Sequence, residues 1–223
     1  MGKTVIFDVD GTLLDTESVY MEGWRRAGRE FGFHVTEEAL LQTRAVSTAV
    51  AKEVFRKLVS PDFPFDTVRP RRVEISEEII ESLPPEKLRM PYAQILLPAL
   101  RREGYAVAAA SSTNLEKTTA HLTQAGLLPF FSAIVGGDMV TRGKPEPDIF
   151  LKAAALTGAD PSECIVVGDT PADVFAAHAA GMKMILIPDQ VPVNEKTIPL
   201  SWRILSGLEE VPAAIGEWEN AFR

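Results

Sequence analysis

The sequence predicts an α/β protein, a doubly wound parallel sheet with helices on both faces and an inserted α-helical cap domain. Two observations lead to this fold class. Short apolar, β-branched runs recur along the chain and alternate with helix-like stretches, which is typical of βαβ units. A long helical segment without a convincing strand also separates the first run from the second, whereas a crossover usually needs one helix.

Five runs are expected to form the strands of the sheet. They are TVIFDVD (4–10), YAVAAASS (105–112), SAIVGGD (132–138), CIVVGDT (164–170) and KMILIP (183–188). Helices are expected over residues 113–126, 146–158 and 171–182, between consecutive runs. All but the last run end in polar or glycine residues, and functional groups of such sheets gather at the carboxyl ends of the strands. We therefore expect the site at that edge of the sheet.

The segment between the first two strands is expected to be a separate helical cap domain. Amphipathic helices are predicted over residues 17–32, 37–43, 47–59 and 76–83. Residues 60–74 (SPDFPFDTVRPRRVE) are predicted to be an irregular loop, because the stretch contains three prolines and charges of both signs. Trp24 and Phe31, seven residues apart on one helix face, are expected in the cap core. We place the cap at residues 17–88 and the Rossmann-like core at 1–16 and 89–223.

The composition limits the classes of partner. The 223 residues are 46% hydrophobic, enough for a sizeable core, and 31 acidic against 23 basic residues give a net charge of −8, which argues against nucleic acid and anionic membranes. No apolar run approaches the roughly 18 residues that span a bilayer, and the amino terminus lacks a leader pattern, so a cytoplasmic protein is expected. Cys164, the single cysteine, lies in an apolar run and is expected to be a buried, reduced thiol.

Two aspartates at the end of the first predicted strand indicate chemistry. Asp8 and Asp10 are one residue apart, so their side chains lie on the same side of a strand, and Gly11 permits a sharp turn after them. Buried carboxylates are rare and two close together repel each other, so a purely structural strand has little reason to carry them. One of the pair could attack an electrophile while the other transfers protons.

The stretch DVDGTLLDTE (8–17) resembles the first motif of the haloacid dehalogenase superfamily of phosphotransferases and phosphatases. The other motifs of that family can be matched in order. Ser111 matches the second motif, whose hydroxyl binds a phosphate oxygen, and Lys144 in GKPEPDIF matches the third, a charge-balancing cation. Asp169 and Asp173 in VVGDTPADV match the acidic pair of the fourth, which serves the metal ion. A helical cap between the first two motifs is a recognised subclass of this superfamily.

The charges of these residues require a metal ion. Four carboxylates and one lysine sum to −3, and a phosphate dianion about 4 Å from even one uncompensated charge meets repulsion of about 4 kcal/mol at an intermediate dielectric. A divalent cation is therefore expected, and oxygen ligands with a phosphate partner favour Mg²⁺. The candidate ligands, in chain order, are Asp8, Asp10, Asp169 and Asp173.

The resemblance implies a mechanism and the residues that carry it. Asp8 would attack phosphorus to form an aspartyl-phosphate, and Asp10 would protonate the leaving oxygen and then activate water, with Ser111 and Lys144 neutralising charge. The further candidates for binding phosphate or substrate are Gly11, Ser112, Asn114 and, in the cap, Arg44. The expected partner is a small phosphorylated metabolite. The sequence does not indicate the oligomeric state.

Alternatives to this phosphatase remain open. A β-phosphoglucomutase-like mutase is the nearest, but that group carries a cap histidine where this chain has Tyr20, and an acidic pair where this chain has Gly168 and Asp169. Both departures favour a phosphatase similar to phosphoglycolate or sugar-phosphate phosphatases. The non-enzymatic alternatives are a receiver-like phospho-switch, although receivers are shorter and lack a helical insert, and a binding protein that has kept the motifs.

Overall fold

The structure is a computed structural model that describes residues 3–44, 46, 48–189 and 193–220. The chain forms two compact units. One is Asp15–Leu83, and the other comprises Met1–Leu14 and Pro84–Arg223. The boundaries between the units lie after residues 14 and 83, whereas the sequence analysis places them after residues 16 and 88. Each unit is described by itself below.

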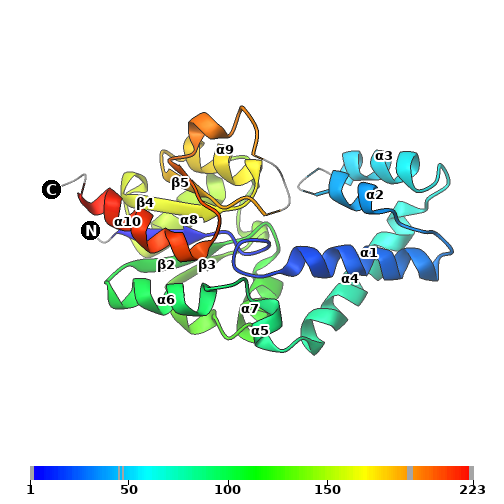
Figure 1. Ribbon diagram of the computed structural model, residues 1–223, viewed down its shortest axis with the longest axis horizontal. Coiled ribbons are helices and arrows are strands. Elements are labelled where there is room, and N and C mark those ends of the chain that lie inside the picture. Colours follow the sequence, from blue (N-terminus) through cyan, green and yellow to red (C-terminus); the bar gives the residue numbers. More distant parts are fainter. Residues whose placement is uncertain (1–2, 45, 47, 190–192, 221–223) are drawn as a thin grey trace. The chain divides into compact units, whose positions relative to one another are not determined.

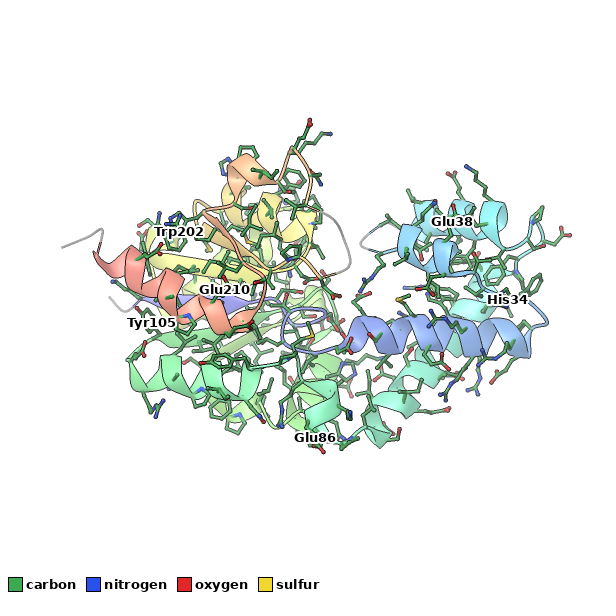
Figure 2. All side chains as sticks on the ribbon, viewed as in Figure 1. His34, Glu38, Glu86, Tyr105, Trp202 and Glu210 are labelled. Atoms are coloured by element: carbon green, nitrogen blue, oxygen red, sulfur yellow. The ribbon has the colours of Figure 1, made fainter. Side chains whose placement is uncertain are left out.

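The larger unit contains a parallel sheet, as predicted, and its six strands have the order β3-β2-β1-β4-β5-β6. Strands β2, β3, β4 and β5 are labelled in Figure 1. The five expected strands are β1 (Thr4–Phe7), β2 (Ala106–Ala110), β3 (Ala133–Val135), β4 (Cys164–Gly168) and β5 (Lys183–Leu186). The sixth, β6 (Arg203–Ile204), was not expected, because it has two residues and both are exposed. It follows Trp202, labelled in Figure 2, whose backbone N–H donates to Met184 O at 2.8 Å.

Helices cover both faces of this sheet. Helices α8 (Asp148–Thr157) and α9 (Pro171–Ala179) pack in one buried core with alternate strand residues such as Ile6 and Val166. The residues between these point to the opposite face, where α6 (Ala93–Arg102) contacts β2 and α10 (Val211–Asn220) contacts α6. Cys164 belongs to the first core, and its burial raises the pKa of its thiol to about 11. The expected burial of Cys164 is confirmed.

The remaining helices of the larger unit connect these layers. Helix α5 (Pro85–Leu88) precedes α6, and α7 (Leu115–Gln124) follows β2. Short 3₁₀ turns occupy Leu128–Phe130, Gly137–Met139, Pro161–Glu163, Ile198–Leu200 and Leu208–Glu210.

The strand order contains a point at which the direction of winding reverses. Strand β1 is central, β2 and β3 extend the sheet on one side, and β4 and β5 extend it on the other. The winding therefore reverses between the adjacent strands β1 and β4, and the loops that leave these two strands lead to opposite sides. Asp8 N donates to Val167 O at 2.8 Å, which continues the pairing of β1 with β4 to the first aspartate of the motif.

The smaller unit is helical, as predicted. Its helices are α1 (Thr16–Glu30), α2 (Glu37–Gln42), α3 (Thr48–Leu58) and α4 (Phe65–Ser82). Residue 47, the expected first residue of α3, lies outside the described residues. The core is a cluster of aromatic rings in which Phe55 has its ring centroid 4.5 Å from that of Trp24 and 4.8 Å from that of Phe63. Trp24 was expected in this core, but Phe31 is 39% exposed because α1 has already ended at Glu30.

The loop expected over residues 60–74 was wrong beyond residue 64. Helix α4 starts at Phe65 and continues through Pro70, although proline cannot donate the helical hydrogen bond and usually ends a helix. Packing against α1 offsets that cost. A Cβ atom at Gly23 would lie 2.3 Å from Ser76 Oγ and 3.1 Å from Arg72 O, so the absence of a side chain lets α1 and α4 approach closely.

No helix within the described parts of the chain is long and apolar enough to cross a membrane.

Phe55 is fully buried, and replacing it with alanine should destabilise the helical unit strongly. We expect Phe55→Ala to lower the free energy of unfolding by about 3–5 kcal/mol, because it removes an aromatic side chain and leaves a cavity among the three rings that it contacts. Urea unfolding followed by tryptophan fluorescence measures this. The control is Leu41→Ala, whose side chain is 45% exposed and should change stability by about 0.5 kcal/mol or less. Equal effects of the two substitutions would contradict the packing described here.

Candidate active site

Asp8 and Lys144 form a buried ion pair at the carboxyl end of β1. Only 6% of Asp8 is exposed, and Lys144 Nζ donates to its Oδ1. The same ammonium group donates to Ala110 O at 2.9 Å and forms a second ion pair with Asp173 Oδ1 at 2.7 Å. Ala110 ends β2, and Asp173 lies in the first turn of α9 after β4. Lys144 therefore joins the ends of three strands beside the point at which the winding reverses.

Burial and charge shift the pKa values of this pair. Burial raises the pKa of Asp8 to about 7, the nearby Lys144 cation opposes that rise, and Asp173 and Asp10 add to it. Burial alone would lower the pKa of Lys144, but the negative charges of Asp173 and Asp8 outweigh it and raise that pKa well above its usual value. Lys144 is therefore charged across the physiological range, and the Asp8 carboxylate depends on nearby positive charge to stay ionised.

The fourth-motif aspartates are held by threonine hydroxyls. Thr12 Oγ1 donates to Asp169 Oδ1 at 2.7 Å, and both residues are buried. Thr170 is the N-cap of α9, and Asp173 Oδ2 accepts from the Thr170 N–H at 3.0 Å and from its hydroxyl. Asp173 is thus both a helix-capping residue and an ion-pair partner of Lys144.

Three carboxylates lie close enough together to hold a metal ion. One oxygen each of Asp8, Asp169 and Asp173 lies within 4.8 Å of the others, and all three residues are buried. Gly11 is required beside them, because it has a φ of +86° and a Cβ atom there would lie 2.6 Å from Asp169 Oδ2. Lys144 balances one of the three negative charges. A buried group of oxygen donors with excess negative charge fits a hard divalent cation.

Asp10 lies outside this group of three. It is half-buried, and its Oδ2 accepts hydrogen bonds from the hydroxyls of Ser111 at 2.8 Å and Thr113 at 3.1 Å. Ser111, fully buried at the end of β2, also accepts from the Thr113 N–H at 3.0 Å. The structure therefore brings the first and second motifs together through Asp10, whereas Asp8 joins the third and fourth. A role for Asp10 in metal binding stays a prediction.

The other sequence-predicted residues occupy different positions. Ser112 is exposed in the loop after β2, and the side chain of Asn114 is the N-cap of α7, accepting from Lys117 N at 2.9 Å. Arg44 lies in the helical unit, where its side chain is 6% exposed and its Nε is 3.3 Å from Glu17 Oε2. Substrate binding by these three residues stays a prediction.

Sequence reasoning missed three threonines that hold the aspartates, Thr12, Thr113 and Thr170. Each lies within two or three residues of a motif residue, and this closeness is the sequence feature that could have identified them. Threonine is so common in turns and caps that this signal is weak without the structure.

The raised pKa of Asp8 predicts how the stability of the metal-free protein depends on pH. Its pKa of about 7 in the folded state exceeds the ordinary aspartate pKa of 3.8, so between these values the folded protein binds a proton that the unfolded chain has released. The Asp8 contribution should therefore fall as pH rises from about 4 to 7, with a slope of at most about 1.4 kcal/mol per pH unit.

Urea unfolding in the presence of a chelator, at pH 5 and pH 7.5, measures this contribution. Wild type should lose more stability between the two pH values than Asp8→Asn, because the amide does not titrate. Titrating groups that do not interact with Asp8 behave alike in both proteins and cancel in the comparison. A variant that loses as much stability as wild type would contradict the assigned shift.

Comparison with known proteins identifies a family. A family model described as haloacid dehalogenase-like hydrolase matches residues 5–187. The hexitol phosphatase A of Escherichia coli is 32% identical over 214 residues, covering 94% of this chain and 93% of its own. The fructose-1-phosphate phosphatase of E. coli is 30% identical over 183 residues, covering 81% of this chain and 94% of its own.

A solved structure shows the same fold. The β-phosphoglucomutase of Clostridium difficile superposes with a TM-score of 0.76 at 17% identity, covering 98% of this chain and 99% of its own. The sequence match, the motif residues at the ends of β1, β2 and β4, and the inserted helical segment lead to one conclusion. The chain belongs to the haloacid dehalogenase-like hydrolase family.

Proposed function

We propose that the protein is a Mg²⁺-dependent phosphatase that hydrolyses a small phosphomonoester through an aspartyl-phosphate on Asp8. The observation that carries this proposal is the position of Asp8. It is a buried carboxylate at the reversal point of the sheet, it pairs with Lys144, and it lies within 4.8 Å of Asp169 and Asp173. A carboxylate in such a place is poised to attack an anion only if cations neutralise both partners.

In the first step an Asp8 oxygen forms a bond to phosphorus while the bond from phosphorus to the leaving oxygen breaks. Asp10 gives that oxygen a proton, so the product leaves as a neutral alcohol. We assign Ser111 to donate to a phosphate oxygen and Lys144, which donates to Asp8, to balance the charge on Asp8 and the phosphoryl group. We assign the backbone N–H groups of Asp10 and Ser112, with the Asn114 segment, to the rest of the phosphate cradle. The Gly11 N–H donates to Leu14 O at 2.8 Å, so Gly11 contributes the sharp turn and not a donor.

In the second step water hydrolyses the aspartyl-phosphate. Asp10 takes a proton from the water as its oxygen attacks phosphorus, and the bond between phosphorus and Asp8 breaks. Inorganic phosphate leaves and both carboxylates return to their starting states. One residue thus serves as acid and then as base, which requires Asp10 to keep its position through both steps.

Asp8, Asp169 and Asp173 are the residues that would hold the metal ion, with Asp10 as a further candidate. When bound, Mg²⁺ supplies positive charge to the phosphoryl oxygens as negative charge shifts among them in the transition state. Thr12 and Thr170 would keep Asp169 and Asp173 oriented toward the ion.

Small phosphorylated carbohydrates and phosphoglycolate-like metabolites are the proposed substrates. The two E. coli relatives are named for fructose 1-phosphate and hexitol phosphates. In the helical unit, the buried Arg44 guanidinium beside Glu17 offers a cation and an acceptor for a substrate with hydroxyl or anionic groups. Such metabolites are intracellular, and the single cysteine agrees with a cytoplasmic protein.

The residues that distinguish a phosphatase from a mutase favour the phosphatase. Tyr20 stands where mutases carry a histidine, and the Arg72 guanidinium lies 4.2 Å from its ring centroid. A phenol has an unperturbed pKa of about 10, so it does not exchange protons near neutral pH as an imidazole does. At Gly168 a Cβ atom would lie 2.8 Å from Asp173 Cγ, so the acidic side chain that mutases carry there has no room.

Phosphate release from a panel of esters tests the proposal. The panel contains fructose 1-phosphate, hexitol phosphates, phosphoglycolate and p-nitrophenyl phosphate, each with Mg²⁺ and with a chelator. We expect metal-dependent turnover that falls at least about 10³-fold in Asp8→Asn, because an amide is a far weaker nucleophile. The matched control is Asp62→Asn, an exposed carboxylate of the helical unit, which should keep wild-type activity. Turnover that survives in Asp8→Asn would exclude Asp8 as the nucleophile.

Product analysis separates the phosphatase from the mutase. We expect β-glucose 1-phosphate, with glucose 1,6-bisphosphate added as primer, to give only glucose and inorganic phosphate, because Tyr20 cannot serve the proton transfers of a mutase cycle. Phosphorus NMR measures inorganic phosphate and glucose 6-phosphate, the product of a mutase, in the same sample. Glucose 6-phosphate formed faster than inorganic phosphate would favour the mutase.

A further inference from the structure

Under the proposed function, Asp10 and the substrate would compete for the hydroxyl hydrogen of Ser111. Under the proposed function Ser111 donates to a phosphate oxygen, but in the structure its hydroxyl donates to Asp10 Oδ2 at 2.8 Å. A serine hydroxyl has one hydrogen. Because the phosphate would take that hydrogen, Asp10 would lose the Ser111 bond when its position matters most.

Thr113 supplies a second donor to the same oxygen. Its Oγ1 lies 3.1 Å from Asp10 Oδ2, and its N–H donates to Ser111 Oγ at 3.0 Å. The bond from the Thr113 N–H occupies a lone pair of Ser111 Oγ and so orients the hydroxyl hydrogen of Ser111. The bond from the Thr113 hydroxyl holds Asp10 whether or not Ser111 also donates to it. Both bonds are made within the larger unit.

The loop that carries Thr113 is held by the residues after β3. Gly137 N donates to Thr113 O at 2.8 Å, and Asp138 Oδ1 accepts from Leu115 N at 2.8 Å. Glycine is needed for this approach, because a Cβ atom at Gly137 would lie 2.4 Å from Ser112 O and one at Gly136 only 2.2 Å from Leu115 N. The sequence suggests that the polar end of β3 is part of the site. In the structure, Gly137 and Asp138 at this end hold the loop after β2.

We infer that Thr113 is a positioning residue that helps to keep the Asp10 carboxylate aligned for proton transfer once Ser111 has turned to the phosphate. This inference rests on the proposed function and deepens it. Thr113 itself touches neither the phosphate nor the nucleophile in this scheme.

Thr113→Val tests the inference, since valine has nearly the same shape but no hydroxyl. The esters are p-nitrophenyl phosphate and the sugar phosphate of the panel that wild type hydrolyses fastest. A sugar alkoxide needs a proton to leave, whereas a nitrophenolate does not. The value of kcat/KM reports the steps up to and including phosphoryl transfer to Asp8. We therefore expect Thr113→Val to lower kcat/KM about 10- to 100-fold with the sugar phosphate and much less with the aryl ester.

The second step gives an independent readout. Hydrolysis of the aspartyl-phosphate also needs Asp10, so kcat on p-nitrophenyl phosphate should fall and a pre-steady-state burst of nitrophenol should appear or grow. Thr113→Ser retains the hydroxyl and should restore wild-type values. Thr123→Val is the control, because that hydroxyl bonds only within α7, to Thr119 O at 2.7 Å, and the substitution should leave all rates unchanged.

The outcomes separate this inference from the proposed function. If wild type hydrolyses the panel and Thr113→Val lowers kcat/KM equally for both esters, the residue has a merely structural role and the inference is wrong. It is also wrong if Thr113→Val keeps wild-type rates. If wild type releases no phosphate from any ester, the proposed function fails and this inference fails with it.

Discussion

The ion pairs of Lys144 with Asp8 and Asp173 are the interactions on which the rest of the site depends. They connect the ends of β1, β2 and β4, three strands far apart in the sequence, through one buried ammonium group. Without that cation the buried carboxylates would repel each other across a medium in which charges are poorly screened. With it, one positive charge faces three carboxylates, and the excess negative charge makes the site receptive to a divalent cation.

A layer of hydroxyl groups surrounds the charged residues and fixes their orientation. Thr12 holds Asp169, Thr170 holds Asp173, and Ser111 with Thr113 holds Asp10. Hydrogen bonds to carboxylates are stronger than those between neutral groups, and they constrain a side chain that could otherwise rotate. Each of these hydroxyls lies within three residues of a motif residue. Local sequence therefore supplies both the reacting groups and the groups that orient them.

The larger and smaller units are packed in different ways. In the larger unit, buried strands bring chemistry-bearing loops to one edge of a sheet, and helices on both faces exclude water from its core. The smaller unit has no sheet among its described residues and depends on aromatic rings clustered around Phe55. Close contact of α1 and α4 at Gly23 and Ser76 orders a helix that contains Pro70, an arrangement that local propensity opposes.

The sequence by itself determined the fold class, five of the strands and the identity of the motif residues. Alternating apolar runs and helical periodicity depend on neighbours in the chain, and the spacing of the motifs can be read directly. Only the tertiary structure decided that α4 continues through Pro70 and that β6 forms at the edge, because both depend on contacts between distant segments. It likewise decided which hydroxyl meets which carboxylate. Thr12 and Asp169 are 157 residues apart, and only the pairing of β1 with β4 brings them within a hydrogen bond of each other.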